Sequence, residues 1–172
     1  MKKFKLGFCP TRRDCFSKEE AQRFRQLVQQ SLIDLIDLKG LNAEELLCDR
    51  HDLEAIIDRF RNEKVDAMFF PHCNFGSEML VSQVALAVGK PVLLWGPRDD
   101  APDAAGVRSR DSQCGLFATG KVLRRHNVPF TYLTNTPVDS LEFHEKLASA
   151  ADFDCKVVPT FRPDLALMPN WQ

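Results

Sequence analysis

The sequence predicts an α/β protein in which helices cover both faces of one parallel sheet. Short, almost wholly apolar runs alternate with longer segments whose apolar residues recur at the helical period. The clearest run, VDAMFF at 65–70, is too short for a helix and is typical of a parallel strand buried on both faces. The chain has 172 residues, 44% of them hydrophobic and 27% charged, which fits one compact domain with a single core.

The expected elements follow this alternation in chain order. Apolar runs predict strands at 4–9, near 44–48, and at 65–70, 91–95 and 128–133, with Gly96-Pro97 breaking the fourth. Helical spacing and caps predict helices over 17–40, around 53–60, over 77–89, from about 112 to 126, and from Pro137 through Leu141 and Leu147. In the first helix, Ser17 and Glu20 have the spacing of a capping box.

Five strands that alternate with five helices predict right-handed crossovers and a three-layer αβα sandwich. We expect a flavodoxin-like five-stranded parallel sheet with the strand order 2-1-3-4-5. This domain is expected to span residues 1–155. Residues 156–172 are expected to form an irregular tail, because three prolines there prevent a long helix or strand.

The expected strand order brings three loops, 9–16, 71–77 and 96–111, to one edge of the sheet, where ligands bind in such folds. The third loop is long for a compact domain, which favours a functional role. Turns and helix caps use the same residue types as binding loops, so a purely structural interpretation stays open. The polar residues of this edge are Arg12, Arg13, Asp14, His72, Asn74, Glu78, Arg98, Asp99, Arg110, Asp111 and Gln113.

Several common uses of this fold do not match these loops. The first loop, CPTRRDCFS, has no glycine that would let the backbone close on a phosphate. The nucleotide-binding motifs G-x-G-x-x-G and G-x-x-x-x-G-K-[ST] do not occur in the sequence. The third strand ends in Phe70-Pro71 and not in the aspartate of a receiver domain. Cys9 lacks the arginine six positions later that a cysteine phosphatase needs, which favours a small buried hydrophobe there.

Composition and charge bear on the partners and the cellular compartment expected for the protein. A net charge of −1 with scattered Lys and Arg gives no sign of nucleic-acid or membrane binding. The N-terminus lacks a signal-peptide core, so we expect a cytoplasmic protein whose six cysteines are reduced. No Cys/His grouping has zinc spacing.

Three stretches in order resemble the L-fucose/L-arabinose isomerase family: CNFGSE at 73–78, KPVLLWGPRD at 90–99 and RSRDSQCGLFA at 108–118. The resemblance covers residues 4–162 but only the family's first, flavodoxin-like domain. Members are larger, manganese-dependent enzymes that interconvert aldoses and ketoses. Their metal ligands and acid–base pair lie in later parts, so the resemblance implies no catalytic residue, metal ligand or cofactor here, and the chain alone is expected to be inactive.

In that family the first domain contributes oligomer contacts and a rim that closes a neighbouring subunit's sugar pocket. The resemblance therefore implies a sugar as ligand, and a homo-oligomer or the missing domains as partners. Two alternatives stay open: a stand-alone module that binds a sugar, sugar phosphate or other anion, and a domain used only for interaction. The substrate-binding residues implied by the matching loops are Arg12, Arg13, Asn74, Phe75 and Glu78, with Arg98, Arg110 and Gln113 as further candidates.

Overall fold

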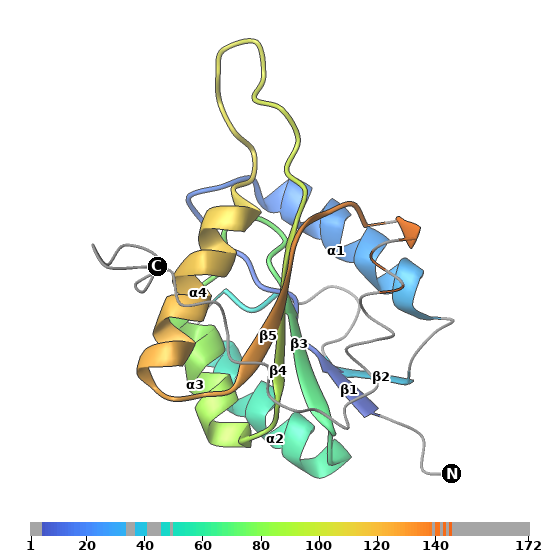
Figure 1. Ribbon diagram of the computed structural model, residues 1–172, viewed down its shortest axis with the longest axis vertical. Coiled ribbons are helices and arrows are strands. Elements are labelled where there is room, and N and C mark those ends of the chain that lie inside the picture. The colour runs from blue at the N-terminus through green and yellow to red at the C-terminus, as the bar shows by residue number, and fades with distance from the viewer. Residues whose placement is uncertain are drawn as a thin grey trace, which may run out of the picture.

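The computed structural model describes residues 5–33, 37–40, 46–48, 50–138, 140, 141, 143 and 145. All strand pairs are parallel, and the strand order is β2-β1-β3-β4-β5. The strands are β1 (Lys5–Phe8), β2 (Asp37–Gly40), β3 (Ala67–Pro71), β4 (Val92–Pro97) and β5 (Phe130–Thr136). The helices are α1 (Lys18–Ile33), α2 (Leu53–Glu63), α3 (Glu78–Val88) and α4 (Ser112–Arg125), and a 3₁₀ turn, η1 (Arg50–Asp52), precedes α2 (Figure 1). The predicted α/β class and parallel sheet are confirmed.

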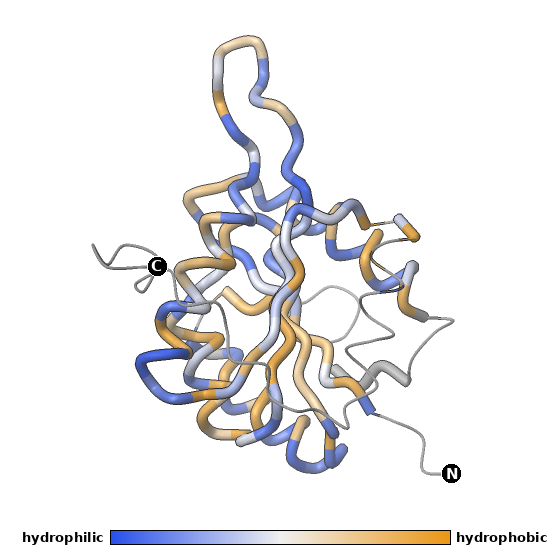
Figure 2. The backbone as a smooth tube through the Cα atoms, viewed as in Figure 1, coloured by the Kyte–Doolittle hydropathy of each residue, from blue (hydrophilic) through white to orange (hydrophobic). Residues whose placement is uncertain are grey.

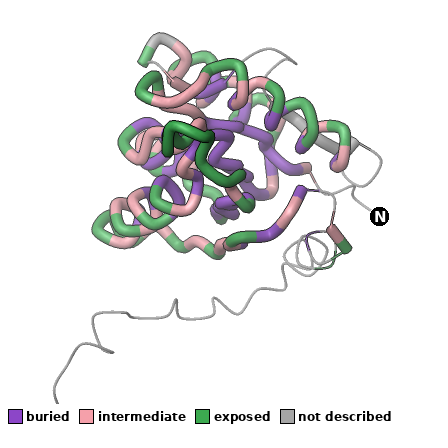
Figure 3. The backbone as a smooth tube through the Cα atoms, turned by 90° about the horizontal axis from the view of Figure 1, so that it is seen from above, coloured by how far each residue is buried: buried purple, intermediate pink, exposed green. Residues whose placement is uncertain are grey.

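The central strands separate two apolar cores because successive side chains of a strand point to opposite faces. On one face, Phe69 and Trp95 pack with the apolar residues of α1. On the other face, Met68 and Leu94 pack with those of α2, α3 and α4. Every residue of β3 and β4 is buried, as expected for a sheet covered on both sides (Figures 2 and 3).

Local signals place the ends of the helices well. The Ser17 Oγ accepts the N–H of Glu20 at 3.1 Å, which is one half of the predicted capping box. The other half is absent from the described contacts, because the Glu20 carboxylate binds Arg23 and the Ser17 N–H donates to the Ser109 carbonyl at 3.2 Å. α3 begins after Ser77, and Gly89 ends it in the left-handed conformation.

The position of the second strand was predicted wrongly. The first helix ends at Ile33 and not at Gly40, and β2 occupies residues 37–40, beside β1 along its whole length. The stretch LIDLIDLKG fits both periods, so pairing with the β1 backbone decides between helix and strand. Near the predicted strand, Leu47 forms an isolated bridge with Thr11, whereas residues 41–45 lie outside the described ones.

Two further boundaries differ from the prediction. β4 continues through Gly96 and Pro97 with a shift in its register against β5, because proline is tolerated where the ladder is irregular. β5 lies two to three residues later than expected, at 130–136. Residues 141, 143 and 145 are helical, in the region expected for a fifth helix, while Leu147 and the expected tail at 156–172 lie outside the described residues.

Candidate functional site

Three loops meet at the carboxyl edge of the sheet. They are the β1–α1 loop (residues 9–17), the β3–α3 loop (72–77) and the β4–α4 loop (98–111). The third loop projects beyond the body of the domain at this edge (Figure 1). This is the edge at which open α/β folds bind their ligands.

Thr11 connects the first two loops and is completely buried. Its N–H donates to the Pro71 carbonyl and its own carbonyl accepts from the Cys73 N–H, both at 2.9 Å. Its hydroxyl donates to the Leu47 carbonyl at 3.0 Å and accepts the N–H of Ser77 at 3.1 Å. The β1–α1 and β3–α3 loops are therefore held as one unit at the start of α3.

Asn74 completes this connection from a fully buried position. Its Oδ1 accepts the backbone N–H groups of Arg13 at 2.8 Å, Phe75 at 2.6 Å and Gly76 at 3.3 Å. Its Nδ2 donates to the carbonyls of Arg13 at 3.1 Å and Ser17 at 3.3 Å. Because both amide hydrogens and the carbonyl are engaged, Asn74 positions its neighbours and does not present its amide to a ligand in this conformation.

Above these Thr11 and Asn74 contacts, Arg13 packs with three side chains. We call these four residues the Arg13 cluster (Arg13, Phe16, Phe75 and Glu78). The Arg13 guanidinium lies 4.6 Å from the centre of the Phe75 ring and forms an ion pair with the Glu78 carboxylate. Phe16 stacks on Phe75, with ring centres 5.8 Å apart and planes 10° apart. The Arg13 and Glu78 side chains are 36% and 25% exposed, so both can meet a ligand.

Two other predicted arginines lie near the surface. Arg12 forms an ion pair with Asp14 and thereby lowers the pKa of that carboxyl. Its backbone N–H donates to the Leu47 carbonyl at 3.1 Å. Arg98 is exposed, and its guanidinium reaches the Asn135 carbonyl at 3.5 Å, at the end of β5.

Two glycines allow the β3–α3 loop to pack closely against the β1–α1 loop and against α4. Gly76 has φ of +77°, and a Cβ there would lie 2.7 Å from the Thr11 Cγ2 and 2.8 Å from the His72 Cδ2. A Cβ at Gly115, in α4, would overlap the Phe75 carbonyl oxygen. The α4 backbone therefore packs directly on the loop that carries the Arg13 cluster.

Arg110 lies inside the base of the projecting loop and is 2% exposed. Its guanidinium lies 4.0 Å from the centre of the Phe24 ring and donates to the Arg98 carbonyl at 2.9 Å. The Asp100 and Asp99 carboxylates lie 3.3 and 4.0 Å from the same Nη2. In this conformation Arg110 holds the loop to α1 and does not reach a ligand.

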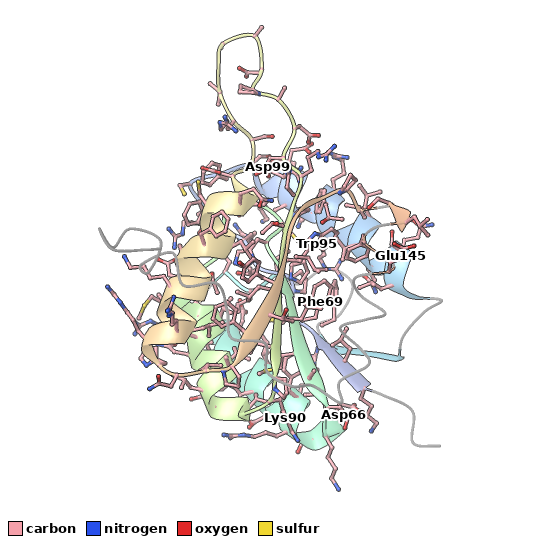
Figure 4. All side chains as sticks on the ribbon, in the orientation of Figure 1. Asp66, Phe69, Lys90, Trp95, Asp99 and Glu145 are labelled. Carbon is pink, nitrogen blue, oxygen red and sulfur yellow. The ribbon has the colours of Figure 1, made fainter. Side chains whose placement is uncertain are left out.

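Asp99 caps α4 from the start of the β4–α4 loop. Its Oδ2 accepts the N–H of Ser112 at 2.8 Å, at the start of α4 (Figure 4). Gln113 also faces inward, where its Nε2 donates to the carbonyls of Gly96 and, at 2.9 Å, Pro97. Both side chains join α4 to the end of β4.

The eight predicted site residues thus fall into three groups. The structure brings four of them together around the β3–α3 loop and turns two inward at the base of the projecting loop. It leaves the remaining two near the surface, with contacts of their own. The first group is Arg13, Asn74, Phe75 and Glu78, the second is Arg110 and Gln113, and the third is Arg12 and Arg98.

The buried histidine and thiols at this edge are structural. The His72 Nδ1 lies 3.2 Å from the Trp95 carbonyl, and its Nε2 lies 2.9 Å from the Thr119 Oγ1. Burial lowers the pKa of His72 to about 4, so the imidazole is neutral at pH 7. Burial also raises the pKa of Cys73 to about 12 and that of Cys9 well above its ordinary value, which leaves both thiols unreactive.

A family model of the fucose/sulfoquinovose isomerase N-terminal domain matches residues 7–162 of this chain. The chain belongs to that family. The resemblance seen in the three loop motifs is confirmed by a match that covers almost all of the described residues.

The relatives of this domain include sulfoquinovose isomerases and a uronate isomerase. Sulfoquinovose isomerases from Priestia aryabhattai and Priestia megaterium are 24% identical over 145 residues, covering 81% of this chain and 30% of theirs. The uronate isomerase from Caldanaerobacter subterraneus is 49% identical over 51 residues, which is 30% of this chain and 11% of that protein. The chain spans less than a third of the length of these relatives.

A solved solute-binding protein from Bacillus halodurans with bound myo-inositol overlays 90% of this chain and 64% of its own, at 10% identity and a TM-score of 0.34. This likeness is too low to carry any conclusion about a ligand.

The resemblance places the family's manganese site in later domains and not in this one. Among the described residues, no three His, Cys, Asp or Glu side chains gather closely enough to hold a metal ion. These residues do not fit a manganese site, and no step of an isomerase reaction is assigned to a metal here. None of the helices in the described ranges combines the length and apolarity needed to cross a membrane.

Proposed function

We propose that this domain forms one wall of the sugar pocket of an aldose–ketose isomerase and is catalytically incomplete without further domains. In this proposal the rest of the pocket, including the manganese ion and the acid–base groups, comes from the later domains of the family or from a neighbouring subunit. We also propose that residues 1–155 fold as one flavodoxin-like domain that supplies oligomer contacts.

The Arg13 cluster is the observation that supports this proposal. A half-exposed guanidinium, a carboxylate and an aromatic ring lie together on a rigid base at the ligand-binding edge of the fold. The guanidinium donates hydrogen bonds, the carboxylate accepts them, and the ring can cover an apolar sugar face. In this role Arg13 and Glu78 bind sugar hydroxyls, Phe75 covers the ring, and Asn74 positions all three.

The substrate is best identified by assaying the candidate sugars side by side. L-Fucose and L-arabinose are the substrates expected from the motifs, and sulfoquinovose is the one named for the Priestia relatives. We propose an aldose of this group as substrate, and the assay below should include all three.

The test is reconstitution. The full chain is mixed with a Priestia sulfoquinovose isomerase that lacks its own first domain, in the presence of manganese, and formation of the ketose is followed for each sugar. We expect no turnover from either part alone and turnover from the mixture. The variant Arg13→Ala should restore turnover only with a KM raised at least about tenfold, whereas Arg125→Ala, an exposed arginine in the last turn of α4, should restore it fully. Turnover by the chain alone would refute the proposal.

A stand-alone binding module is a second candidate, and one observation favours it: a cavity of ligand size in the described part of this domain. In that case free sugars or phosphates should raise the melting temperature of the chain without any partner. A melting temperature that no such compound changes would count against this candidate.

A further inference from the structure

A cavity of about 360 Å³ lies between the β1–α1 loop and the projecting β4–α4 loop. Its volume is within the range of small-molecule sites. One wall contains Cys15, Phe16 and Ser17, and the other contains Asp103, Val107 and Arg108. None of these six residues is among the predicted site residues. The cavity borders the Arg13 cluster through Phe16, which belongs to both.

Contacts on both sides hold the walls of this cavity in place. The Ser17 N–H donates to the Ser109 carbonyl at 3.2 Å, which joins the two walls directly. Behind the first wall, the Asn74 Nδ2 donates to the Ser17 carbonyl at 3.3 Å. An ion pair of 3.6 Å between Arg23 of α1 and Asp100 holds the base of the second wall.

The tip of the projecting loop is ordered by its own hydrogen bonds. The Oδ1 of Asp103 accepts the N–H groups of Ala105 and Val107, both at 2.9 Å. The backbone N–H of Asp103 donates to the Val107 carbonyl at 3.0 Å, and the Gly106 N–H returns to the Asp103 carbonyl at 2.9 Å. The cavity is therefore formed before a ligand arrives, although residues 100–108 are all exposed.

The side chains in the walls suit a sugar that carries an acidic group. Phe16 offers an aromatic surface in one wall, and Val107, which is 60% exposed, offers an apolar surface in the other. Arg108 is exposed and lines the cavity, and within the described ranges its side chain has no ion pair or hydrogen bond. By contrast, Arg12 and Arg13 at this edge are already paired with carboxylates. The Asp103 carboxylate is partly neutralised by the two backbone N–H groups that it binds.

We propose that this cavity binds a monosaccharide with a carboxylate or sulfonate group, whose ring packs on Phe16 and Val107 and whose acidic group binds Arg108. The inference does not require the isomerase assignment, because every residue in it belongs to this chain and binding needs no second domain. A free sugar acid and the acidic end of a longer saccharide share this chemistry.

Cys15 provides a direct readout because its exposed thiol lines the cavity. The exposed thiol of Cys114 is not an independent control, because Asp111 raises its pKa and the nearby Arg108 opposes that shift. The control is therefore acetate, which carries an acidic group without a sugar ring, at the same concentrations. The full chain is alkylated with iodoacetamide at increasing D-galacturonate or D-galactose concentrations, and each site is followed by peptide mass spectrometry. We expect galacturonate to slow alkylation of Cys15 in a saturable manner, and acetate at the same concentrations to leave the Cys15 rate unchanged. Galactose should protect only at higher concentration.

Three variants separate the contribution of the Arg108 charge from that of the Phe16 ring. Arg108→Gln should abolish the preference for the acid, which amounts to at least about tenfold in apparent affinity for a charge-assisted contact. Phe16→Leu should weaken protection by both sugars. Arg125→Gln, a matched exposed arginine at the end of α4, should behave like the unchanged chain. Circular dichroism confirms that each variant is folded before its rates are compared.

Three outcomes would overturn the proposal or part of it, and two others would identify the source of the ligand or test the isomerase role separately. Unchanged Cys15 alkylation at saturating galacturonate would show that the cavity does not bind it, and equal slowing by galacturonate and acetate would show a non-specific effect of the anion. Equal protection by galacturonate and galactose would show that Arg108 does not bind the acidic group. A digalacturonate that protects as well as the monomer identifies the end of a saccharide as a ligand. Failure of the reconstitution assay with intact Cys15 protection would refute the isomerase role alone.

Discussion

The Arg13 guanidinium lies over the Phe75 ring, 4.6 Å from its centre, while the same side chain forms an ion pair with Glu78. Neither partner belongs to the loop that carries Arg13, so the side chain links the β1–α1 loop to the β3–α3 loop and to the first turn of α3. Its orientation is thus fixed before any ligand binds.

Replacing Arg13 should separate function from stability. Arg13→Ala removes a partly exposed ion pair and one cation–π contact, so the free energy of unfolding should fall by no more than about 1 kcal/mol. In the reconstituted isomerase the same change should raise KM at least about tenfold, since a charge-assisted contact is lost. Urea unfolding and steady-state kinetics measure the two effects. A large loss of stability would show that Arg13 is mainly structural.

Asn74→Ala should destabilise the domain strongly. The change removes the acceptor of one buried and two partly buried backbone N–H groups, at a cost of about 3 kcal/mol or more. The measurement is urea unfolding, with Asn62→Ala on the exposed side of α2 as the matched control, expected within about 0.5 kcal/mol of the unchanged chain. If both variants unfold at the same urea concentration, Asn74 does not hold the loops together.

Gly115→Ala should be much more costly than an ordinary helix substitution. The added methyl group meets the Phe75 carbonyl oxygen, so α4 must move away from the β3–α3 loop, at about 3 kcal/mol or more. Gly89→Ala is the control, since nothing lies within 4 Å of its added Cβ and only the left-handed conformation opposes it, at about 1 kcal/mol. Thermal unfolding ranks the two, and an equal loss would contradict the close packing of α4.

His72 should make stability depend on pH between about 6.5 and 4. Burial lowers its pKa to about 4 in the folded chain, so the unfolded chain takes up a proton first as pH falls. Its contribution is complete above pH 6.5 and is lost as pH falls towards 4, by up to about 3 kcal/mol. Urea unfolding at pH 7 and pH 5 should show this loss, and His72→Gln should have a smaller difference between the two. An unchanged difference would place the pH dependence elsewhere.

Local signals explain the parts of the fold that the sequence predicted well. α3 ends at Gly89 because a glycine in the left-handed conformation stops a helix within one turn, and it begins after Ser77 as predicted, although the Ser77 side chain makes no cap hydrogen bond. β3 was clear because its whole run is apolar. β2 was misplaced because its position depends on pairing with β1, and no pattern within LIDLIDLKG encodes that partner.

The site shows the same division between local and distant interactions. The motif CNFGSE identified a loop rich in functional residue types, and the structure places Asn74, Phe75 and Glu78 with Arg13. The sequence did not reveal that Arg110 lies buried against Phe24, more than eighty residues away in the chain. It also did not reveal that Asp99 caps a helix beginning thirteen residues later. Such contacts depend on the assembled sheet and leave no periodic signal.

The clamped base of the β4–α4 loop has a consequence for how this domain can change. Arg110 and Asp99 hold the two ends of the loop, and the residues between them touch little else. The stretch from 101 to 108 can therefore be exchanged, lengthened or shortened without disturbing α4 or the sheet. Because Asp103, Val107 and Arg108 in this stretch line the proposed cavity, exchanging the tip should change which ligand the domain accepts while the fold is kept.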